Sequence, residues 1–276
     1  MIARPQLRLP RAESALVGLC LAVTLAFILA CASAPTPRPM PVSRWAGGYN
    51  YSFQVPRVIE TASGRINIVV VQPERDRESA LGERLNVRVS RGFSRSMGVD
   101  MDKILVAKGM TTIGPYATLD DVTFPDKKAA DLTLAPRVFI NTETKLGNSY
   151  NTTYDGVGYV EKRFVMKIAG WVSYEMREPL SGQKMWVKRL DLDEREVKGV
   201  EIYEAVALRR DQYGNVTQWQ AGEVKFSGRE DALGDALAAY YPEIMQRAWT
   251  YLDPSEMIEL KEKTREIRDR IQAPLR

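Results

Sequence analysis

The sequence predicts an α+β fold: a mixed, mostly antiparallel sheet with helices packed on one face and a C-terminal helical extension. Two observations support this. Apolar residues recur at every second position in the middle of the chain, which is typical of strands. They recur every three to four positions at 93–108 and 233–248, which is typical of helices. The 276 residues allow a sizeable core, and we expect one domain at 45–250 and a charged helix at 251–276.

Residues 1–31 have the pattern of a bacterial lipoprotein signal peptide. Three Arg precede the apolar run Ala15–Ala30, which is shorter than the about 20 residues of a stable membrane span. The run ends in Ile28–Cys31, which resembles a lipobox. We expect Cys31 to carry lipid, including palmitate, and to attach the protein to a membrane. An uncleaved anchor and an ordinary secretory signal are the alternatives.

A Pro-rich tether follows at residues 32–44. Its four alternating Pro favour an extended conformation, which at about 3.1 Å per residue could hold a domain ~40 Å from a bilayer. Ala32 and Ser33 replace the Asp that commonly retains lipoproteins at the inner membrane, so we expect the outer membrane. The sequence leaves open whether the domain faces the outside or the periplasm.

The composition argues against an enzyme. The chain has no His, and its two Cys, Cys20 and Cys31, both precede the domain. We therefore expect no His or Cys metal site, no Ser-His-Asp triad and no cofactor. Removal of the signal peptide takes away three Arg and one Glu, which lowers the formal net charge from +4 to +2. A nucleic-acid partner is not expected at this charge.

The first half of the domain is expected to alternate strands and helices. Alternating aromatic residues predict a strand at 49–58, and the β-branched run 66–71 predicts a buried central strand. Residues 84–91 fit either a strand or the start of a helix. An amphipathic helix is expected at 93–108, where Gly109 ends it.

The stretch from Phe124 to Ile140 is expected to organise the core. After a short strand at 110–115, residues 124–128 predict a turn and Leu132 begins a strand that closes the core. Pro136 cannot donate to a ladder, so it indicates an edge or a bulge. Residues 141–156, rich in Asn, Thr and Tyr, predict a polar loop.

Two hairpins are expected next. Residues 164–176 alternate most clearly, with Phe164, Met166, Ile168, Val172, Tyr174 and Met176 on one face. The chain reverses at 178–183, where Gly182 suits a positive φ, and returns at 185–192. The second hairpin pairs 200–208 with 216–226.

Two helices complete the chain. The stripe at 233–248 contains Pro242, which predicts a kink or a restart. Asp253, followed by Pro254 and Glu256, has the pattern of a helix N-terminus. The helix at 254–271 is expected either to lie against the body or to form a self-association seam.

Several pieces in this order resemble the neuraminyllactose-binding haemagglutinin family, also described as flagellar sheath adhesin lipoproteins. The matching pieces are the lipobox ending in Cys31, the strand Ile68–Val71 before Pro73, Lys103–Gly109, Phe124 with Lys127 and Lys128, Glu178–Gly182 leading to Leu190–Leu192, and Ala232–Gln246.

The resemblance implies a lipid-anchored envelope protein with a mixed α/β domain and lectin activity toward sialylated glycans. Where the family has a short basic motif, this chain has Asn141–Lys145 with one Lys. We expect a non-catalytic outer-membrane lipoprotein of adhesin type that binds a glycan or a host surface, with sialylated glycans as the candidate ligand. The alternative is a periplasm-facing accessory lipoprotein that binds an envelope or flagellar-associated protein assembly.

A sialic-acid site needs a cation for the carboxylate and an aromatic face for the sugar ring. Tyr150 and Tyr154, followed by Lys162 and Arg163, supply these residue types, although a plain polar loop explains them too. A second candidate is the pair Lys127 and Lys128. The alternative there is a turn organised by Asp126 with two solvated lysines.

Overall fold

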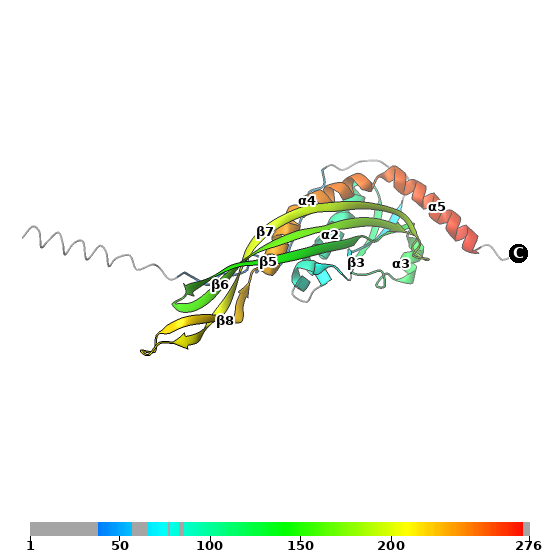
Figure 1. Cartoon of the computed structure of the whole chain (residues 1–276). Coiled ribbons are helices and arrows are strands. Elements are labelled where there is room, and N and C mark those ends of the chain that lie inside the picture. The colour runs from blue at the N-terminus through cyan, green and yellow to red at the C-terminus, as the bar shows by residue number, and fades with distance from the viewer. Residues whose placement is uncertain (1–37, 57–65, 77, 83–85, 273–276) are drawn as a thin grey trace, which may run out of the picture. The chain divides into compact units, whose positions relative to one another are not determined.

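The computed structural model describes residues 38–56, 66–76, 78–82 and 86–272. It confirms the α+β class, with a mixed eight-stranded sheet and helices (Figure 1). Cys31, the signal peptide and the first part of the tether lie outside the described residues. Among the helices of the described part, none is long and apolar enough to cross a membrane.

The chain divides into two compact units. The described part of the first consists of residues 38–40 and 153–157. There the backbone N–H of Asp155 donates to the Arg38 carbonyl at 3.2 Å, and the Arg38 guanidinium lies 5.4 Å from the centre of the Tyr154 ring. The second unit contains the remaining described residues and holds the hydrophobic core.

Three parallel strands form one side of the sheet. The predicted central strand is confirmed: β1 (Asn67–Val71) lies between β3 (Thr111–Tyr116) and β4 (Leu132–Leu134) and is parallel to both. The helix α2 (Val87–Ala107) connects β1 to β3, so the segment predicted at 84–91 as either a strand or a helix start is a helix start over its described residues. Gly109 follows α2 with φ +80°, which confirms it as the stop.

Long antiparallel strands form the other side. These are β5 (Arg137–Tyr154), β6 (Val157–Arg177), β7 (Lys184–Arg210) and β8 (Val216–Ser227). All six predicted inward residues of β6 are buried, and both predicted hairpins are present. The returns predicted at 185–192 and 200–208 are parts of the single strand β7. Gly182 has the predicted positive φ, +69°.

Helices α4 (Arg229–Tyr251) and α5 (Pro254–Gln272) share the main core with α2. The Tyr240 hydroxyl donates to the Ile168 carbonyl at 2.8 Å, and the Tyr174 hydroxyl donates to the Ile244 carbonyl at 2.6 Å, which fixes α4 on β6. The helix α4 continues through Pro242 without a restart. The opposite face of β1 packs its Val69 and Val71 with Val122 and Ala130 in a second, smaller cluster.

The predicted strand at 49–58 is wrong over its described part, because residues 49–56 form no ladder. Their backbone bonds to helix side chains instead. The N–H of Tyr51 donates to Ser96 Oγ at 3.0 Å, and the N–H of Phe53 donates to Asp100 Oδ2 at 2.8 Å. Side-chain acceptors on α2 thus replace a neighbouring strand, which aromatic alternation alone does not reveal.

The predicted turn at 124–128 is instead a short helix, α3 (Phe124–Ala129). Thr123 caps it by accepting the N–H of Asp126, and Pro125 is tolerated in the first helical turn because its missing N–H needs no partner there.

The strand predicted from Leu132 is present but interrupted at Ala135-Pro136. Since β7 pairs with one edge of β6 from Tyr159 to Arg177, β4 and β5 share the other edge in succession. Pro136, expected at an edge or a bulge, lies in this break. Its carbonyl accepts the N–H of Glu74, next to Arg75 in the two-residue strand β2 (Glu74–Arg75).

The predicted loop at 141–156 is also wrong, because β5 extends to Tyr154. Asp155 (φ +47°) and Gly156 (φ +79°) then form a two-residue hairpin turn. Most side chains from Asn141 to Thr153 are exposed. Where neither face of a strand is buried, the apolar alternation that predicts a strand disappears.

Candidate functional site

A hollow of about 520 Å³ lies on the sheet where β5, β6 and β7 run side by side. We call it the basic groove. It is lined by Lys145, Leu146, Gly147, Arg163, Phe164, Val165, Lys198, Gly199 and Val200. Three strands thus each contribute one cation to the same hollow.

One glycine of the groove lining, Gly199, leaves room for an aromatic ring. Gly199 pairs with Phe164 across the β6–β7 ladder, and the Phe164 ring covers it. A Cβ at position 199 would lie 2.3 Å from the Cζ of Phe164. The ring therefore packs in the room that a missing side chain leaves, and Phe164 is itself buried.

The three cations differ in how far they are neutralised. The Lys145 ammonium lies 3.6 Å from a Glu143 carboxylate oxygen, and Arg163 Nε lies 3.3 Å from Glu161 Oε1. Lys198 has no ion-pair partner in the described part of the chain. The groove therefore offers an uncompensated positive charge.

An aromatic ring accompanies this charge. The Arg163 guanidinium lies over the Tyr150 ring, 5.1 Å from its centre, in cation–π geometry. Tyr150 remains 46% exposed, and Leu146 in the groove is 53% exposed. The groove thus combines cations with an apolar side chain, and an accessible aromatic ring lies against one of its cations.

The structure brings together only part of the predicted site. Arg163 and Tyr150 are in contact. Lys162, next along the strand, points to the opposite face and holds its ammonium 4.6 Å from the centre of the Tyr203 ring. Tyr154 belongs to the first unit, where it is buried beside Arg38.

The other predicted pair, Lys127 and Lys128, lies on α3 and does not join the groove. The chain passes from α3 into β4, which pairs with Arg177. Arg177 lies fourteen residues beyond Arg163 on β6, roughly 45 Å along an extended strand. The six candidate residues therefore do not form one site.

Sequence reasoning missed Lys198 and the role of the glycines. A Gly inside a strand, as in Lys198-Gly199, signals a close approach of another group, but not which one. Lys145 is the single Lys at the position of the family's basic motif. The structure places it in the same groove as Arg163, which lies eighteen positions away in sequence.

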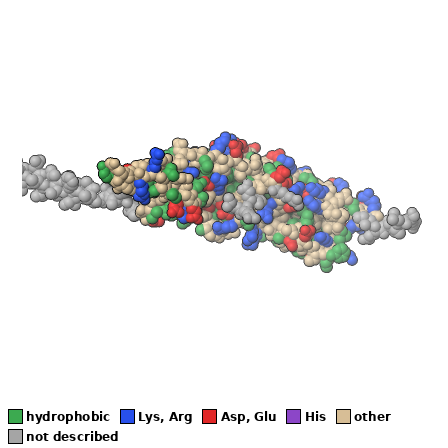
Figure 2. All heavy atoms as spheres, turned by 60° about the horizontal axis from the view of Figure 1, so that its bottom comes forward, with side chains coloured by type: hydrophobic (Ala, Val, Ile, Leu, Met, Phe, Trp, Pro, Cys, Tyr) green, Lys and Arg blue, Asp and Glu red, His purple; other side chains and the backbone are tan. Residues whose placement is uncertain are grey.

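Charged side chains of both signs are mixed on the molecular surface. Figure 2 shows basic, acidic and hydrophobic side chains mixed over the face it draws, without one broad patch of a single charge. Across the described ranges, no three His, Cys, Asp or Glu side chains come together as metal ligands would.

Comparison with known proteins gives a distant structural resemblance. No protein-family model and no curated protein sequence matches the chain. A solved neuraminyllactose-binding hemagglutinin homolog from Helicobacter pylori matches with 12% identity and a TM-score of 0.42, over 81% of this chain and 97% of that one. A hypothetical protein from Chlamydia trachomatis matches with 9% identity and a TM-score of 0.23, over 68% of this chain and 98% of that one. Membership of the haemagglutinin family stays a prediction.

Proposed function

We propose that this protein is a non-catalytic lipoprotein of adhesin type, anchored to the outer membrane through Cys31, which binds sialylated glycans in the basic groove. The observation that carries the proposal is the meeting of Lys145, Arg163 and Lys198 beside the exposed ring of Tyr150.

The groove matches the chemistry of sialic acid group by group. The Lys198 ammonium, without an acidic partner among the described residues, is available to a carboxylate in a charge-assisted hydrogen bond. The Tyr150 ring offers a face to the sugar ring, and exposed Leu146 offers apolar contact to an N-acetyl methyl group. A shallow surface groove suits the end of a long glycan.

Titration of the purified mature protein with 3′-sialyllactose and with lactose tests the proposal. We expect binding of sialyllactose and little binding of lactose, because only the former carries a carboxylate. The double variant Arg163→Ala/Lys198→Ala should weaken sialyllactose binding at least tenfold, which corresponds to about 1.4 kcal/mol.

The matched control is Lys263→Ala/Arg265→Ala, which removes two charges from the exposed side of α5. Its affinity should stay within about twofold of the parent protein, a change of only about 0.4 kcal/mol. Equal binding of lactose and sialyllactose would contradict the proposal, as would a groove variant that binds like the control.

A periplasm-facing accessory lipoprotein is the second candidate function. It is favoured by exposed apolar side chains on the β7–β8 hairpin, which is where a protein partner would bind. These are Val206, Leu208, Tyr213, Trp219 and Val224. Protease treatment of intact cells separates the two functions: complete protection of the domain would exclude the adhesin, and cleavage would support it.

A further inference from the structure

A crevice lies on the sheet face opposite the main core, where β1, β3 and β4 end. Its larger part has a volume of about 520 Å³ and is lined by residues 71–75, 117–120, 135–136 and 177. A smaller part of about 210 Å³ shares Leu119, Asp120 and Arg177 with it and reaches Lys127. We call both parts together the strand-end crevice.

Two prolines in the crevice lining interrupt the strands of the sheet. Pro73 separates β1 from β2, and Pro136 separates β4 from β5, and neither has an N–H to donate. The neighbouring backbone groups keep partners: the N–H of Gln72 donates to the Tyr116 carbonyl, and that of Glu74 donates to the Pro136 carbonyl. The ladder is interrupted without leaving these groups unsatisfied. In parallel α/β sheets such carboxyl-terminal strand ends are the usual place for ligands.

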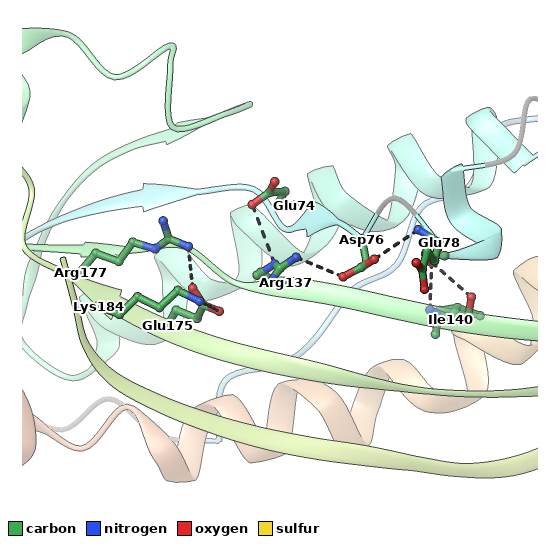
Figure 3. Close-up of polar contacts among 9 residues, drawn as sticks. Glu74, Asp76, Glu78, Arg137, Ile140, Glu175, Arg177 and Lys184 are labelled. Carbon is green, nitrogen blue, oxygen red and sulfur yellow. Dashed lines mark hydrogen bonds and ion pairs between the residues drawn. The ribbon is translucent and has the colours of Figure 1, made fainter. Parts of the chain in front are cut away.

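The lining residue Arg177 is paired with a buried carboxylate, that of Glu175 (Figure 3). Glu175 is 3% exposed, and its two oxygens accept hydrogen bonds from Arg177 Nη2 at 2.6 Å and from Lys184 Nζ at 2.9 Å. Burial alone raises the pKa of Glu175, but the bonds from Lys184 and Arg177 outweigh it and hold the pKa below its usual range. One ionised acid thus meets two cations, and the trio carries one net positive charge.

Two buried guanidinium donors at the crevice have no acceptor. They are Nε of Arg177, which lines both parts of the crevice, and Nε of Arg137, which follows the lining residue Pro136; neither has a hydrogen-bond partner in the described part of the chain. The Nη2 of Arg137 donates to Asp76 Oδ2 at 3.1 Å (Figure 3). The Nε of Arg137 lies 4.0 Å from Glu74 Oε2, which is too far for a hydrogen bond. A buried N–H without an acceptor costs about 1–3 kcal/mol, so a cluster of them needs an explanation.

The charges around the crevice specify the kind of ligand. Besides the positive trio there is Arg75, whose guanidinium bonds to the neutral hydroxyl of Ser90 at 3.1 Å. Against these stand Glu74 and Asp76, which share Arg137, and Asp120, which has no ion-pair partner among the described residues. The smaller part of the crevice adds Lys127 and Glu178, one charge of each sign. Positive and negative groups balance, which disfavours a dianion such as phosphate. A ligand with one carboxylate and one ammonium keeps the balance.

We propose that the strand-end crevice binds an α-amino-acid zwitterion, either a free amino acid or a short peptide. Arg177 receives the carboxylate and Asp120, at the mouth, receives the ammonium. The volume exceeds that of one amino acid and admits a peptide of two or three residues. The crevice is separated from the basic groove by roughly 45 Å along β6, so this binding does not depend on the glycan site.

Calorimetric titration of the mature full-length protein tests the proposal. The probes are the twenty L-amino acids, trialanine, trialanine amide and N-acetyl-trialanine. We expect trialanine or an amino acid to bind, and each capped peptide to bind at least tenfold more weakly than trialanine. Comparing the affinity of the free amino acids with that of trialanine shows whether the crevice prefers a free amino acid or a peptide.

Two variants locate the site. Arg177→Lys keeps a charge beside Glu175 but removes the Nε donor, and Asp120→Asn changes only an exposed carboxylate. Each should weaken binding at least tenfold, whereas Arg209→Lys and Asp269→Asn, at exposed positions on β7 and α5, should leave it unchanged. The proposal is overturned if none of the probes binds, if inorganic phosphate binds more tightly than the peptide, if N-acetylation has no effect, or if both site variants bind like their controls.

Discussion

At the residue scale, one glycine shapes the proposed glycan site. Gly199 on β7 leaves room for the Phe164 ring of β6, and this pair lies next to Arg163 on β6 and Lys198 on β7. The cations of the groove act together only because their strands lie at normal ladder distance, which a side chain at position 199 would disturb.

Gly199→Ala should therefore lower the free energy of unfolding by about 1–3 kcal/mol, because the new Cβ overlaps a buried ring that has little room to move. Urea denaturation measures the change. Gly158→Ala is the matched control, since a Cβ there meets nothing within 4 Å. Equal stability of the two variants would show that the ring is not confined.

Glu178 is the second residue with a specific consequence. Its buried carboxylate accepts the backbone N–H of Leu180 at 2.9 Å and Arg268 Nε at 3.0 Å, which joins the β6–β7 turn to α5. Burial alone raises the pKa of Glu178, but hydrogen bonds from Ser181, Leu180 and Arg268 outweigh it and lower the pKa.

Glu178→Gln should cost about 2–3 kcal/mol at pH 7, since Arg268 loses a charged partner. A lowered pKa in the folded state means that this stabilisation is complete above the unfolded value of about 4.3 and is lost as the pH falls through the folded value. Urea unfolding at pH 7 and at steps down to pH 3 should show the parent and the variant converging. Glu259→Gln, at an exposed position of α5, is the control, and a difference that stayed constant with pH would refute the assignment.

At the element scale, the sequence predicted the strands with one buried face and missed the rest. The six alternating apolar residues from Phe164 to Met176 identified β6, whereas β5 beyond Ile140 was predicted as a loop because its Asn and Thr residues face solvent. The segment 49–56 shows the converse: its aromatic residues alternate because they pack on α2 and α4, not because they form a ladder.

The same limit applies to the candidate site. Arg163 and Tyr150 could be chosen from residue type, since each suits an acidic sugar. Lys198 could not, because its place beside Arg163 depends on the β6–β7 register, which fixes Arg163 opposite Val200. Proximity across strands is set by pairing, and the sequence carries no local sign of it.

The helix α5 was predicted from its first residues. Asp253 Oδ1 accepts the backbone N–H of Ser255 at 2.8 Å, and Met257, Leu260 and Thr264 are buried against the chain itself. The self-association proposed for 254–271 would have to compete with these contacts or use the other face of the helix.

Asp253→Ala should reduce stability by about 1 kcal/mol, because the first turn of α5 loses its capping acceptor. Hydrogen exchange measures this locally: the amides of the first turn should exchange faster, while those of β1 keep their protection. Asp269→Ala, at an exposed position within α5, should change neither. Unchanged exchange in the Asp253 variant would mean that tertiary packing alone holds the helix end.

At the scale of the whole molecule, both proposed functions require attachment to the envelope through Cys31. Cys31→Ser should move the protein from the membrane fraction to the soluble fraction after cell lysis, because no acyl chain is then added. The control is Ser33→Ala, which exchanges one small uncharged residue for another two positions after Cys31. This variant should stay in the membrane fraction. Retention of the Cys31 variant would place the anchor elsewhere.

Mass spectrometry of the N-terminus of the mature protein, purified from membranes, tests the account most directly. We predict a chain that begins at Cys31 and carries acyl groups, including palmitate. A chain that begins at another residue, or a Cys31 without lipid, would contradict it, since neither an outer-membrane adhesin nor an envelope accessory lipoprotein could then be held in place by this sequence.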